Sequence, residues 1–248
     1  MGSYKNRLLA SFKFYFISMI RNWEKYLIRG IHFLLYINLS AFAVSCNQNQ
    51  TIPATETVTD SILPYYSDAS FTPRWRNNRD TGYCNHHISS FKVINQLGDT
   101  VSEINLKNKI YVAGFFFTAC PGICRNLTQQ LRKVQDAFLG EDGIQILSFS
   151  VTPETDNPDK LKMYANTYGI ESKRWWLLTG NRDSIYQMAR KEFFADEDMG
   201  MQKSSKDFLH TENLLLIDHE RCIRGVYKGT SAAEINLLIS DIKTLLQK

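Results

Sequence analysis

Two cysteines separated by three residues are the first feature of this sequence with an evident chemical use. Cys120-Pro121-Gly122-Ile123-Cys124 follows an apolar, β-prone run and precedes a segment with helical periodicity. Free backbone N–H groups and the helix dipole at such a junction stabilise a thiolate, which lowers the thiol pKa below its ordinary value of about 8.5. Residues four apart face the same side of a first helical turn, so both sulfurs can bind one metal ion.

This spacing favours metal binding over dithiol redox chemistry. The common redox pair is Cys-x-x-Cys, and the longer loop between Cys120 and Cys124 widens the distance between the sulfurs without forbidding a disulfide. Sulfur ligands are soft and select Cu(I), and an added imidazole makes a site that also tolerates Cu(II). We therefore expect copper, in one or both oxidation states, and a histidine as third ligand.

Among the five histidines, His210 is the one that we expect to complete this site. It lies just before the predicted strand 214–217, which should neighbour the strand that leads to the cysteines, so that its side chain can reach the sulfurs from a loop. A lone histidine near a strand is often only a hydrogen-bonded residue, and the combination with the two cysteines argues against that alternative. The other histidines are assigned to the targeting segment or to the surface: His32, His86, His87 and His219.

The elements that position these residues follow from hydrophobic periodicity. Residues 109–117 form a continuous apolar run, typical of a strand buried on both faces. Apolar residues at a spacing of three to four, from Leu127 to Phe138, predict a helix. The remaining patterns predict strands at 90–94, 100–104, 144–151, 175–178, 214–217 and 223–227, and helices at 160–168, 183–194 and 232–246.

This order of elements predicts an α/β fold. We expect a thioredoxin-like sandwich with a central mixed sheet, an N-terminal β-hairpin, and a terminal β-hairpin followed by a helix. The folded domain is expected over residues 81–248. It is preceded by residues 46–80, rich in Thr, Pro, Ser and Asn, which predict an exposed tether. Residues 63–66 are apolar enough to dock on the domain instead.

The first 45 residues predict export. They hold six basic residues and one acidic residue of a chain whose formal charge is +4, so the remainder is close to neutral and gives no support for a nucleic-acid partner. The apolar run 31–44 is shorter than the roughly twenty residues that cross a bilayer as a helix. Small residues then lead into Cys46, which predicts a lipoprotein-like signal over 1–45 with Cys46 as the lipid site. An uncleaved anchor is the alternative.

A second apolar stretch before Arg21 makes the leader unusually long, and Met19 is an alternative start. In either case we expect a domain outside the cytoplasm, anchored to the membrane of the cell envelope on the periplasmic side. That compartment permits disulfides and copper handling. Cys84 and Cys222 can therefore form a structural disulfide, and two separate free thiols are the alternative, because sequence does not reveal the separation of their Cα atoms.

Four segments resemble the Sco/SenC family, and the resemblance spans roughly residues 85–245. They are Phe-Phe-Phe-Thr-Ala-Cys-Pro-Gly-Ile-Cys at 115–124, Ser-Phe-Ser-Val-Thr-Pro-Glu-Thr-Asp at 148–156, Leu-Leu-Thr-Gly at 177–180 and Leu-His-Thr at 209–211. The resemblance implies a membrane-attached, thioredoxin-fold copper chaperone. It also implies that Cys120, Cys124 and His210 bind one copper ion for delivery to the dinuclear copper site of cytochrome c oxidase subunit II.

Two positions depart from the pattern of that family. Gly122 stands where the family commonly has an acidic residue between the cysteines, and Thr152 stands where it usually has an Asp before Pro153. An acidic docking role for position 152 therefore does not carry over. Neither departure affects an expected copper ligand.

An enzyme is the alternative from another functional class. In a membrane-tethered thiol-disulfide oxidoreductase that keeps target cysteines reduced, Cys120 would be the attacking thiolate and Cys124 the resolving cysteine. Thioredoxins hold a cis-proline opposite their active cysteines, whereas residues 206–212 contain no proline. We therefore favour the metallochaperone, although the two activities can coexist.

Overall fold

The computed structural model describes residues 63–75, 84–195, 209 and 211–247. All of them belong to the unit Val58–Lys248, whereas the unit Met1–Thr57 lies outside the described residues. The predicted signal and the candidate lipid site Cys46 fall in that undescribed part. Within the described ranges no helix has both the length and the apolar character needed to cross a membrane.

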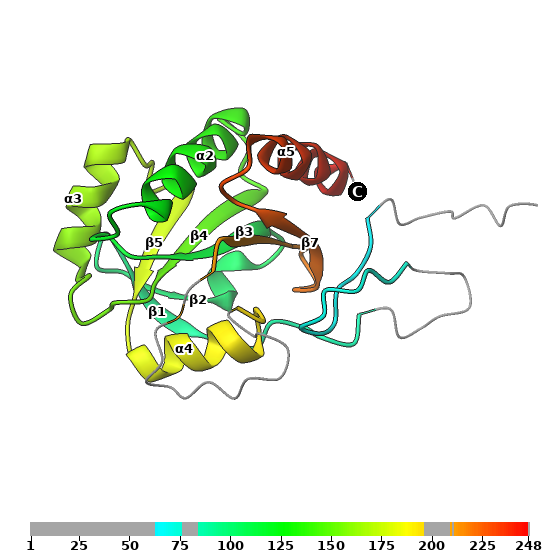
Figure 1. The fold of residues 1–248 in the computed structure, drawn as a ribbon, viewed down its shortest axis with the longest axis horizontal. Helices are drawn as coiled ribbons and strands as arrows, with labels where there is room; N and C mark the ends of the chain where they lie inside the picture. Colours follow the sequence, from blue (N-terminus) through cyan, green and yellow to red (C-terminus); the bar gives the residue numbers. More distant parts are fainter. Residues whose placement is uncertain (1–62, 76–83, 196–208, 210, 248) are drawn as a thin grey trace, which may run out of the picture. The chain divides into compact units, whose positions relative to one another are not determined.

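A seven-stranded mixed sheet forms the centre of the described unit (Figure 1), with the strand order β2-β1-β5-β4-β3-β6-β7. Strands β3, β4 and β5 are parallel, while β1 and β6 pair antiparallel with β5 and β3. The strands are β1 (Lys92–Asn95), β2 (Thr100–Ser102), β3 (Ile110–Phe116), β4 (Ile144–Ser150), β5 (Trp175–Thr179), β6 (Asn213–Ile217) and β7 (Ile223–Lys228). The predicted thioredoxin-like sandwich is confirmed.

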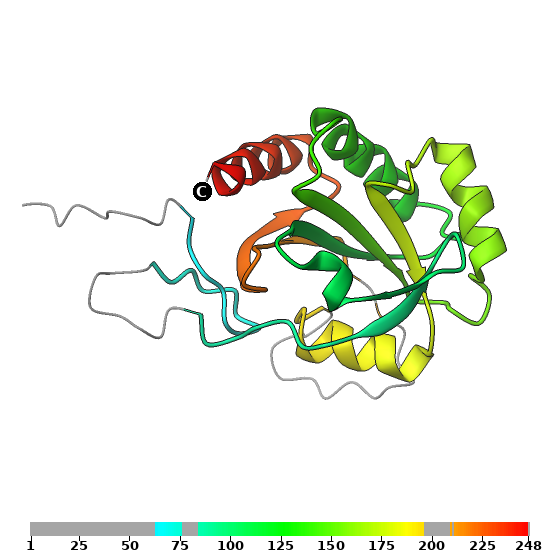
Figure 2. The same cartoon turned by 180° about the vertical axis from the view of Figure 1, so that it is seen from behind.

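Helices cover both faces of the sheet (Figures 1 and 2). Helices α2 (Ile123–Ala137), α3 (Pro158–Tyr168) and α5 (Ala232–Leu246) share one apolar core with the sheet, and α4 (Arg182–Lys191) packs into a second core on the other face. Strand β3 contributes to both cores and is buried along its whole length. This double coverage explains why its sequence is continuously apolar.

Several element boundaries differ from the sequence prediction, among them the end of helix α4, which lies at Lys191 and not at residue 194. Two of the differences have a local cause. Strand β2 ends at Ser102, and a short 3₁₀ helix, η1 (Glu103–Leu106), replaces the rest of the predicted strand. The Asn105 carboxamide accepts a hydrogen bond from the Ser102 N–H at 2.9 Å, which uses a group that strand pairing would need. Helix α3 begins at Pro158, earlier than predicted, because Asn157 caps it by accepting from the Lys160 N–H.

Residues 63–75 dock on the domain beside strand β7. Tyr66 bridges to Ile223, and Leu63 and Tyr65 are buried. The Arg224 guanidinium donates to the carbonyl oxygens of Leu63 and Pro64 and lies 3.8 Å from the centre of the Tyr65 ring. This part of the predicted tether is therefore packed against the domain, in keeping with the apolar character of residues 63–66.

Candidate metal centre

Cys120 and Cys124 lie where β3 passes into α2, as their place in the sequence predicts. Both are free thiols; Cys120 is partly exposed, whereas Cys124 is 5% exposed and packs in the core. The Cys124 N–H donates to the Cys120 sulfur at 3.5 Å. The loop thus presents one sulfur at the surface and the other directly beneath it, so a metal ion can approach Cys120 first.

The two thiols have pKa values shifted in opposite directions. Burial by itself would raise the pKa of Cys120, but N–H groups of Cys124, Gly122 and Ile123 and the Cys124 thiol outweigh burial, so the pKa lies below its ordinary value. Burial raises the pKa of Cys124 to about 12, and its hydrogen bond to Cys120 acts in the same direction. Cys120 therefore loses its proton more readily than Cys124, which is protonated at neutral pH.

Asp156 anchors the loop that leads to the cysteines. Its carboxylate is fully buried and accepts hydrogen bonds from the Thr118 N–H at 3.1 Å, the Ser150 hydroxyl at 2.7 Å and the Thr152 hydroxyl at 3.0 Å. The Lys160 ammonium lies 3.3 Å away. Burial would raise the pKa of Asp156, but these donors outweigh it and hold the pKa below its usual range.

Thr152, one of the two positions that depart from the family pattern, takes part in this anchor. The Thr152 hydroxyl donates to Asp156, so this residue stabilises the buried carboxylate. Asp156 was not predicted to be a structural residue. Its only signal was an acidic residue close to several hydroxyl residues in a segment that follows a buried strand.

His210 lies outside the described residues, so its contact with the two sulfurs remains a prediction. Its neighbours on both sides are described: Leu209 is buried, and the Thr211 hydroxyl accepts from the Asn213 N–H at 3.1 Å. Strand β6 runs antiparallel to β3, with Ala113 opposite Leu215. The start of β6 therefore lies beside the C-terminal end of β3. The predicted proximity of these two strands is confirmed.

A chain of polar contacts ties the start of β6 to the first turn of α2. The Glu212 carboxylate accepts from the Thr230 hydroxyl at 2.6 Å and lies 3.0 Å from the Lys228 ammonium. The Thr230 carbonyl in turn accepts from the Asn126 carboxamide at 3.5 Å. These contacts link Glu212, two positions after His210, to Asn126, two positions after Cys124.

The three other histidines within the described residues lie away from the two cysteines. His219 is exposed in the turn between β6 and β7, at the opposite end of β3 from the cysteines. The His86 imidazole contacts the Glu192 carbonyl oxygen at 2.8 Å. His87 is exposed beside a disulfide that joins Cys84 to Cys222, whose Cα atoms are 6.1 Å apart. Of the two alternatives that the sequence left open for these cysteines, the structure has the disulfide.

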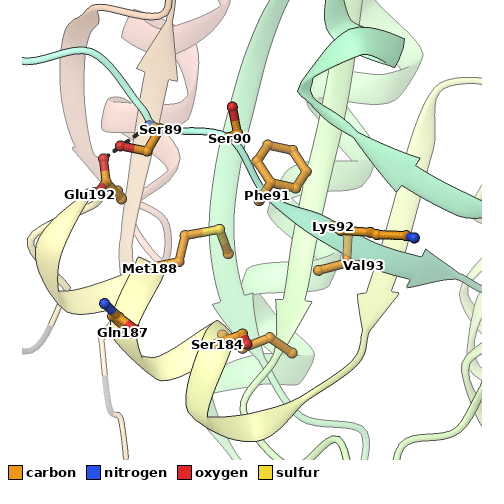
Figure 3. Close-up of a pocket in the computed structure, with 10 residues that line it drawn as sticks. Ser89, Ser90, Phe91, Lys92, Val93, Ser184, Gln187, Met188 and Glu192 are labelled. Atoms are coloured by element: carbon orange, nitrogen blue, oxygen red, sulfur yellow. Dashed lines mark hydrogen bonds between the residues drawn. The ribbon is translucent and has the colours of Figure 1, made fainter.

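A cavity of about 470 Å³ lies between α4 and the chain entering β1, where Met188, Phe91 and Val93 meet (Figure 3). The Glu192 carboxylate closes one end by accepting from the Ser89 N–H at 3.0 Å. The residues that line this cavity include neither cysteine nor histidine, and Met188 supplies the one soft donor atom among them. A lone thioether does not make a metal site, so the cavity is not a second candidate for binding a soft metal ion.

A model of the SCO1/SenC family matches residues 79–247. The chain belongs to this family. An SCO1 homologue of Bacillus subtilis is 30% identical over 162 residues, which are 64% of this chain and 83% of the relative. A protein of Stutzerimonas stutzeri whose name describes copper binding is 24% identical over 140 residues, 56% of this chain and 67% of that protein.

Solved structures of SCO1/SenC proteins share the fold. A family lipoprotein from Bacillus anthracis superposes with a TM-score of 0.57 at 30% identity, covering 65% of this chain and 96% of its own. BsSco, described as a cytochrome c oxidase assembly protein with a disulfide switch, has a TM-score of 0.54 at 28% identity, covering 64% and 93%. In this SCO1/SenC protein, the cysteine pair lies at the junction of β3 and α2.

Proposed function

We propose that this protein is a copper chaperone that binds one copper ion through Cys120, Cys124 and His210. It would deliver the ion to the dinuclear copper site of a cytochrome c oxidase subunit II. The observation that carries the proposal is the pair of free thiols at the β3–α2 junction, one partly exposed with a lowered pKa and one buried beneath it. Thiolate ligands favour Cu(I), and a third ligand from imidazole accommodates Cu(II).

The difference between the two thiols suits a cargo site. Cys120 is the ligand that forms a thiolate readily and faces solvent, so it can engage copper from a donor or pass copper to an acceptor. Cys124 loses its proton only when a metal ion compensates for the negative charge in a buried place, because metal binding displaces thiol protons. Release to an acceptor is thereby coupled to reprotonation of Cys124.

The relatives support the same assignment. The description of BsSco places it among cytochrome c oxidase assembly proteins, and the name of the Stutzerimonas stutzeri protein describes copper binding. The Bacillus anthracis relative is described as a lipoprotein. We accordingly propose that residues 1–45 act as a signal, that Cys46 carries the lipid, and that residues 46–80 connect it to a domain over 81–248 on the periplasmic side.

A thiol-disulfide oxidoreductase is the second candidate, and the same asymmetry favours it. An exposed thiol with a lowered pKa is an effective nucleophile, and a buried neighbour can resolve the mixed disulfide. BsSco, the relative at 28% identity, is described as having a disulfide switch. In this alternative the pair Cys120 and Cys124 would keep the cysteines of a copper acceptor reduced.

A two-arm transfer experiment separates these functions. In the first arm, the full chain loaded with one equivalent of Cu(I) is mixed with a copper-free, reduced subunit II copper domain, and copper is measured in each protein after separation. In the second arm, the copper-free reduced chain is mixed with the oxidised acceptor, and acceptor thiols are counted. Copper transfer in the first arm supports the chaperone. Thiol formation in the second arm with no copper transfer in the first would establish the reductase instead.

A further inference from the structure

Three side chains of metal-ligand type meet at the other end of the sheet. The His87 Nδ1 atom lies 3.7 Å from the Cys84 sulfur and 3.6 Å from the Cys222 sulfur. The two sulfurs and one ring nitrogen lie within 4.8 Å of one another. Two cysteines and one histidine are also the ligand set proposed for the first site, although these three residues come from different parts of the chain.

The backbone around this cluster is fixed by contacts other than the disulfide. His87 and Cys222 form an antiparallel bridge, and the Ile88 N–H donates to the Arg221 carbonyl at 3.0 Å. The Cys222 N–H donates at 2.9 Å to the Asp218 carboxylate. These contacts do not involve the sulfur atoms, so they persist when the disulfide is reduced.

We propose that reduction of the Cys84–Cys222 disulfide opens a second metal site, which binds one Cu(I) ion through both thiolates and the His87 imidazole. A dithiol reductant supplies two electrons and two protons: its own sulfurs join, the Cys84–Cys222 bond breaks, and two thiols form. When Cu(I) binds, both thiols release their protons to solvent. The disulfide therefore acts as a redox gate, and the oxidised protein has no thiolate to offer at this end.

The geometry of the cluster fits a three-coordinate ion. The Cα atoms of Cys84 and Cys222 are 6.1 Å apart, which leaves room for two sulfurs that each lie about 2.3 Å from a shared metal ion. Three ligands suit Cu(I), which soft thiolates select, whereas a structural Zn²⁺ site requires a fourth ligand. Among the described acidic side chains near Cys222, Asp218 is already engaged by Arg224 and by two backbone N–H groups, whereas the exposed Glu220 carboxylate is the one that a Zn²⁺ ion would need to recruit as a fourth ligand.

The His87 ring is held in position for this role. In the oxidised protein, its Nδ1–H donates to the Glu220 carbonyl oxygen at 2.9 Å, which points that edge of the ring toward both sulfurs. Copper binding requires the proton to move to Nε2, so that the Nδ1 lone pair faces the ion. Glu220 is exposed, so its carbonyl can then accept a hydrogen bond from water.

The charge and the place of the cluster favour an independent site. The Glu220 carboxylate lies within 4.8 Å of the Cys222 sulfur and attracts a cation, whereas Arg224 balances the charge of the nearby Asp218. The turn that carries Cys222 lies at the start of β3, whereas Cys120 follows its end; seven strand residues separate the two ends by about 20 Å. Cys84 is partly exposed and His87 is exposed, so a reductant and a copper donor can reach the cluster.

The test uses the full chain with Cys120→Ser and Cys124→Ser, so it does not depend on the function proposed for the first site. This variant is reduced with a dithiol, freed of reductant without oxygen, and titrated with Cu(I) against a colorimetric Cu(I) chelator. We expect one tightly bound copper per reduced chain and none per oxidised chain. No chelator-resistant copper in the reduced chain would overturn the proposal.

Histidine variants distinguish a built site from adventitious thiolate binding. Adding His87→Ala should weaken Cu(I) binding at least tenfold. His219→Ala changes an exposed histidine of the turn that also carries Cys222, and it should leave Cu(I) binding unchanged. Both variants keep Cys84 and Cys222, and thiol counts and circular dichroism verify that each is reduced and folded. Equal affinity in the His87→Ala and His219→Ala chains would show that the imidazole is not a ligand and would contradict the proposed site.

Discussion

Cys120 and Cys124 have different surroundings although only three residues separate them. Backbone N–H groups of the first turn of α2 converge on the Cys120 sulfur, whereas the Cys124 sulfur is buried in the core under α2. The N–H groups stabilise the thiolate form of Cys120, whereas burial stabilises the neutral thiol form of Cys124. The consequence is an ordered site, in which the outer sulfur meets a partner first and the inner sulfur responds to the metal.

This order predicts different alkylation profiles for the two thiols in the reduced, copper-free chain. Because the thiolate is the reactive form and the pKa of Cys120 is lowered, its alkylation rate should reach half of its maximum at a lower pH in the folded chain than in the unfolded chain. Cys124 should react slowly at that pH, since burial raises its pKa to about 12. Iodoacetamide labelling with mass spectrometry measures both rates. The urea-unfolded chain is the control, in which the two profiles should coincide; coincident profiles in the folded chain would contradict the assignment.

For the candidate copper site, sequence alone predicts only those residues whose chemistry follows from their local spacing. The interval between Cys120 and Cys124, and their place at the end of an apolar run, were sufficient to predict two sulfurs at a strand–helix junction. Asp156 and His87 gave no comparable signal. Their roles depend on partners that chain folding brings close, such as Thr118 for the former and Cys222 for the latter.

At the scale of elements, the junction between β7 and α5 packs tightly against the first site. Gly229 donates its N–H to the Glu212 carbonyl at 2.9 Å, and a Cβ atom added to Gly229 would lie 2.9 Å from that oxygen and would overlap the Leu127 side chain of α2. Only a residue without a side chain permits this approach. The glycine thereby brings the start of β6 close to the helix that carries Cys124.

Gly229→Ala should therefore destabilise the fold by about 1–3 kcal/mol, because overpacking forces the backbone at Glu212 or the side chain at Leu127 to shift. Gly180→Ala is the matched control, since the atoms nearest to its added Cβ lie 3.8 Å away, an ordinary contact distance. Urea unfolding followed by circular dichroism gives both free energies. Equal free energies of unfolding for the two variants would show that the β7–α5 junction is not tightly packed.

The elements themselves were largely predictable, because periodicity reports burial. The continuous apolar pattern of 109–117 identified β3, and the spacing from Leu127 to Phe138 identified α2. Boundaries were missed where a side chain competes with the backbone, as Asn105 does after β2 and Asn157 does before α3. Strand order was inferred only in part, since the pairing of β1 with β5 brings together residues far apart in sequence.

At the scale of the whole molecule, the disulfide closes most of the domain into one loop. Cys84 and Cys222 are 138 positions apart, and the bond fastens the segment that enters the domain to the β6–β7 turn. Residues 63–75 also pack beside β7, through Arg224 and Tyr66. The end of the sheet farthest from Cys120 is therefore where the N-terminal part of the described chain is secured.

Replacing both cysteines, Cys84→Ser with Cys222→Ser, should lower the free energy of unfolding by about 2–5 kcal/mol, because the unfolded chain regains the freedom that the long closed loop removes. Urea unfolding without reductant is the measurement. Cys120→Ser, a change at a partly exposed free thiol, is the control and should shift stability by less than about 0.5 kcal/mol. Unchanged stability in the double variant would indicate that the bond does not constrain the chain.

Binding of one copper ion by Cys120, Cys124 and His210 is tested by copper titration of the His210→Ala chain. The full chain is titrated with Cu(II) while its thiolate-to-copper absorption is followed, with Cys84 and Cys222 kept oxidised and His219→Ala as the matched control. We expect His210→Ala to abolish the absorption and to lower the affinity at least tenfold, whereas His219→Ala should change neither. Unchanged absorption and affinity in the His210→Ala chain would show that His210 is not a copper ligand.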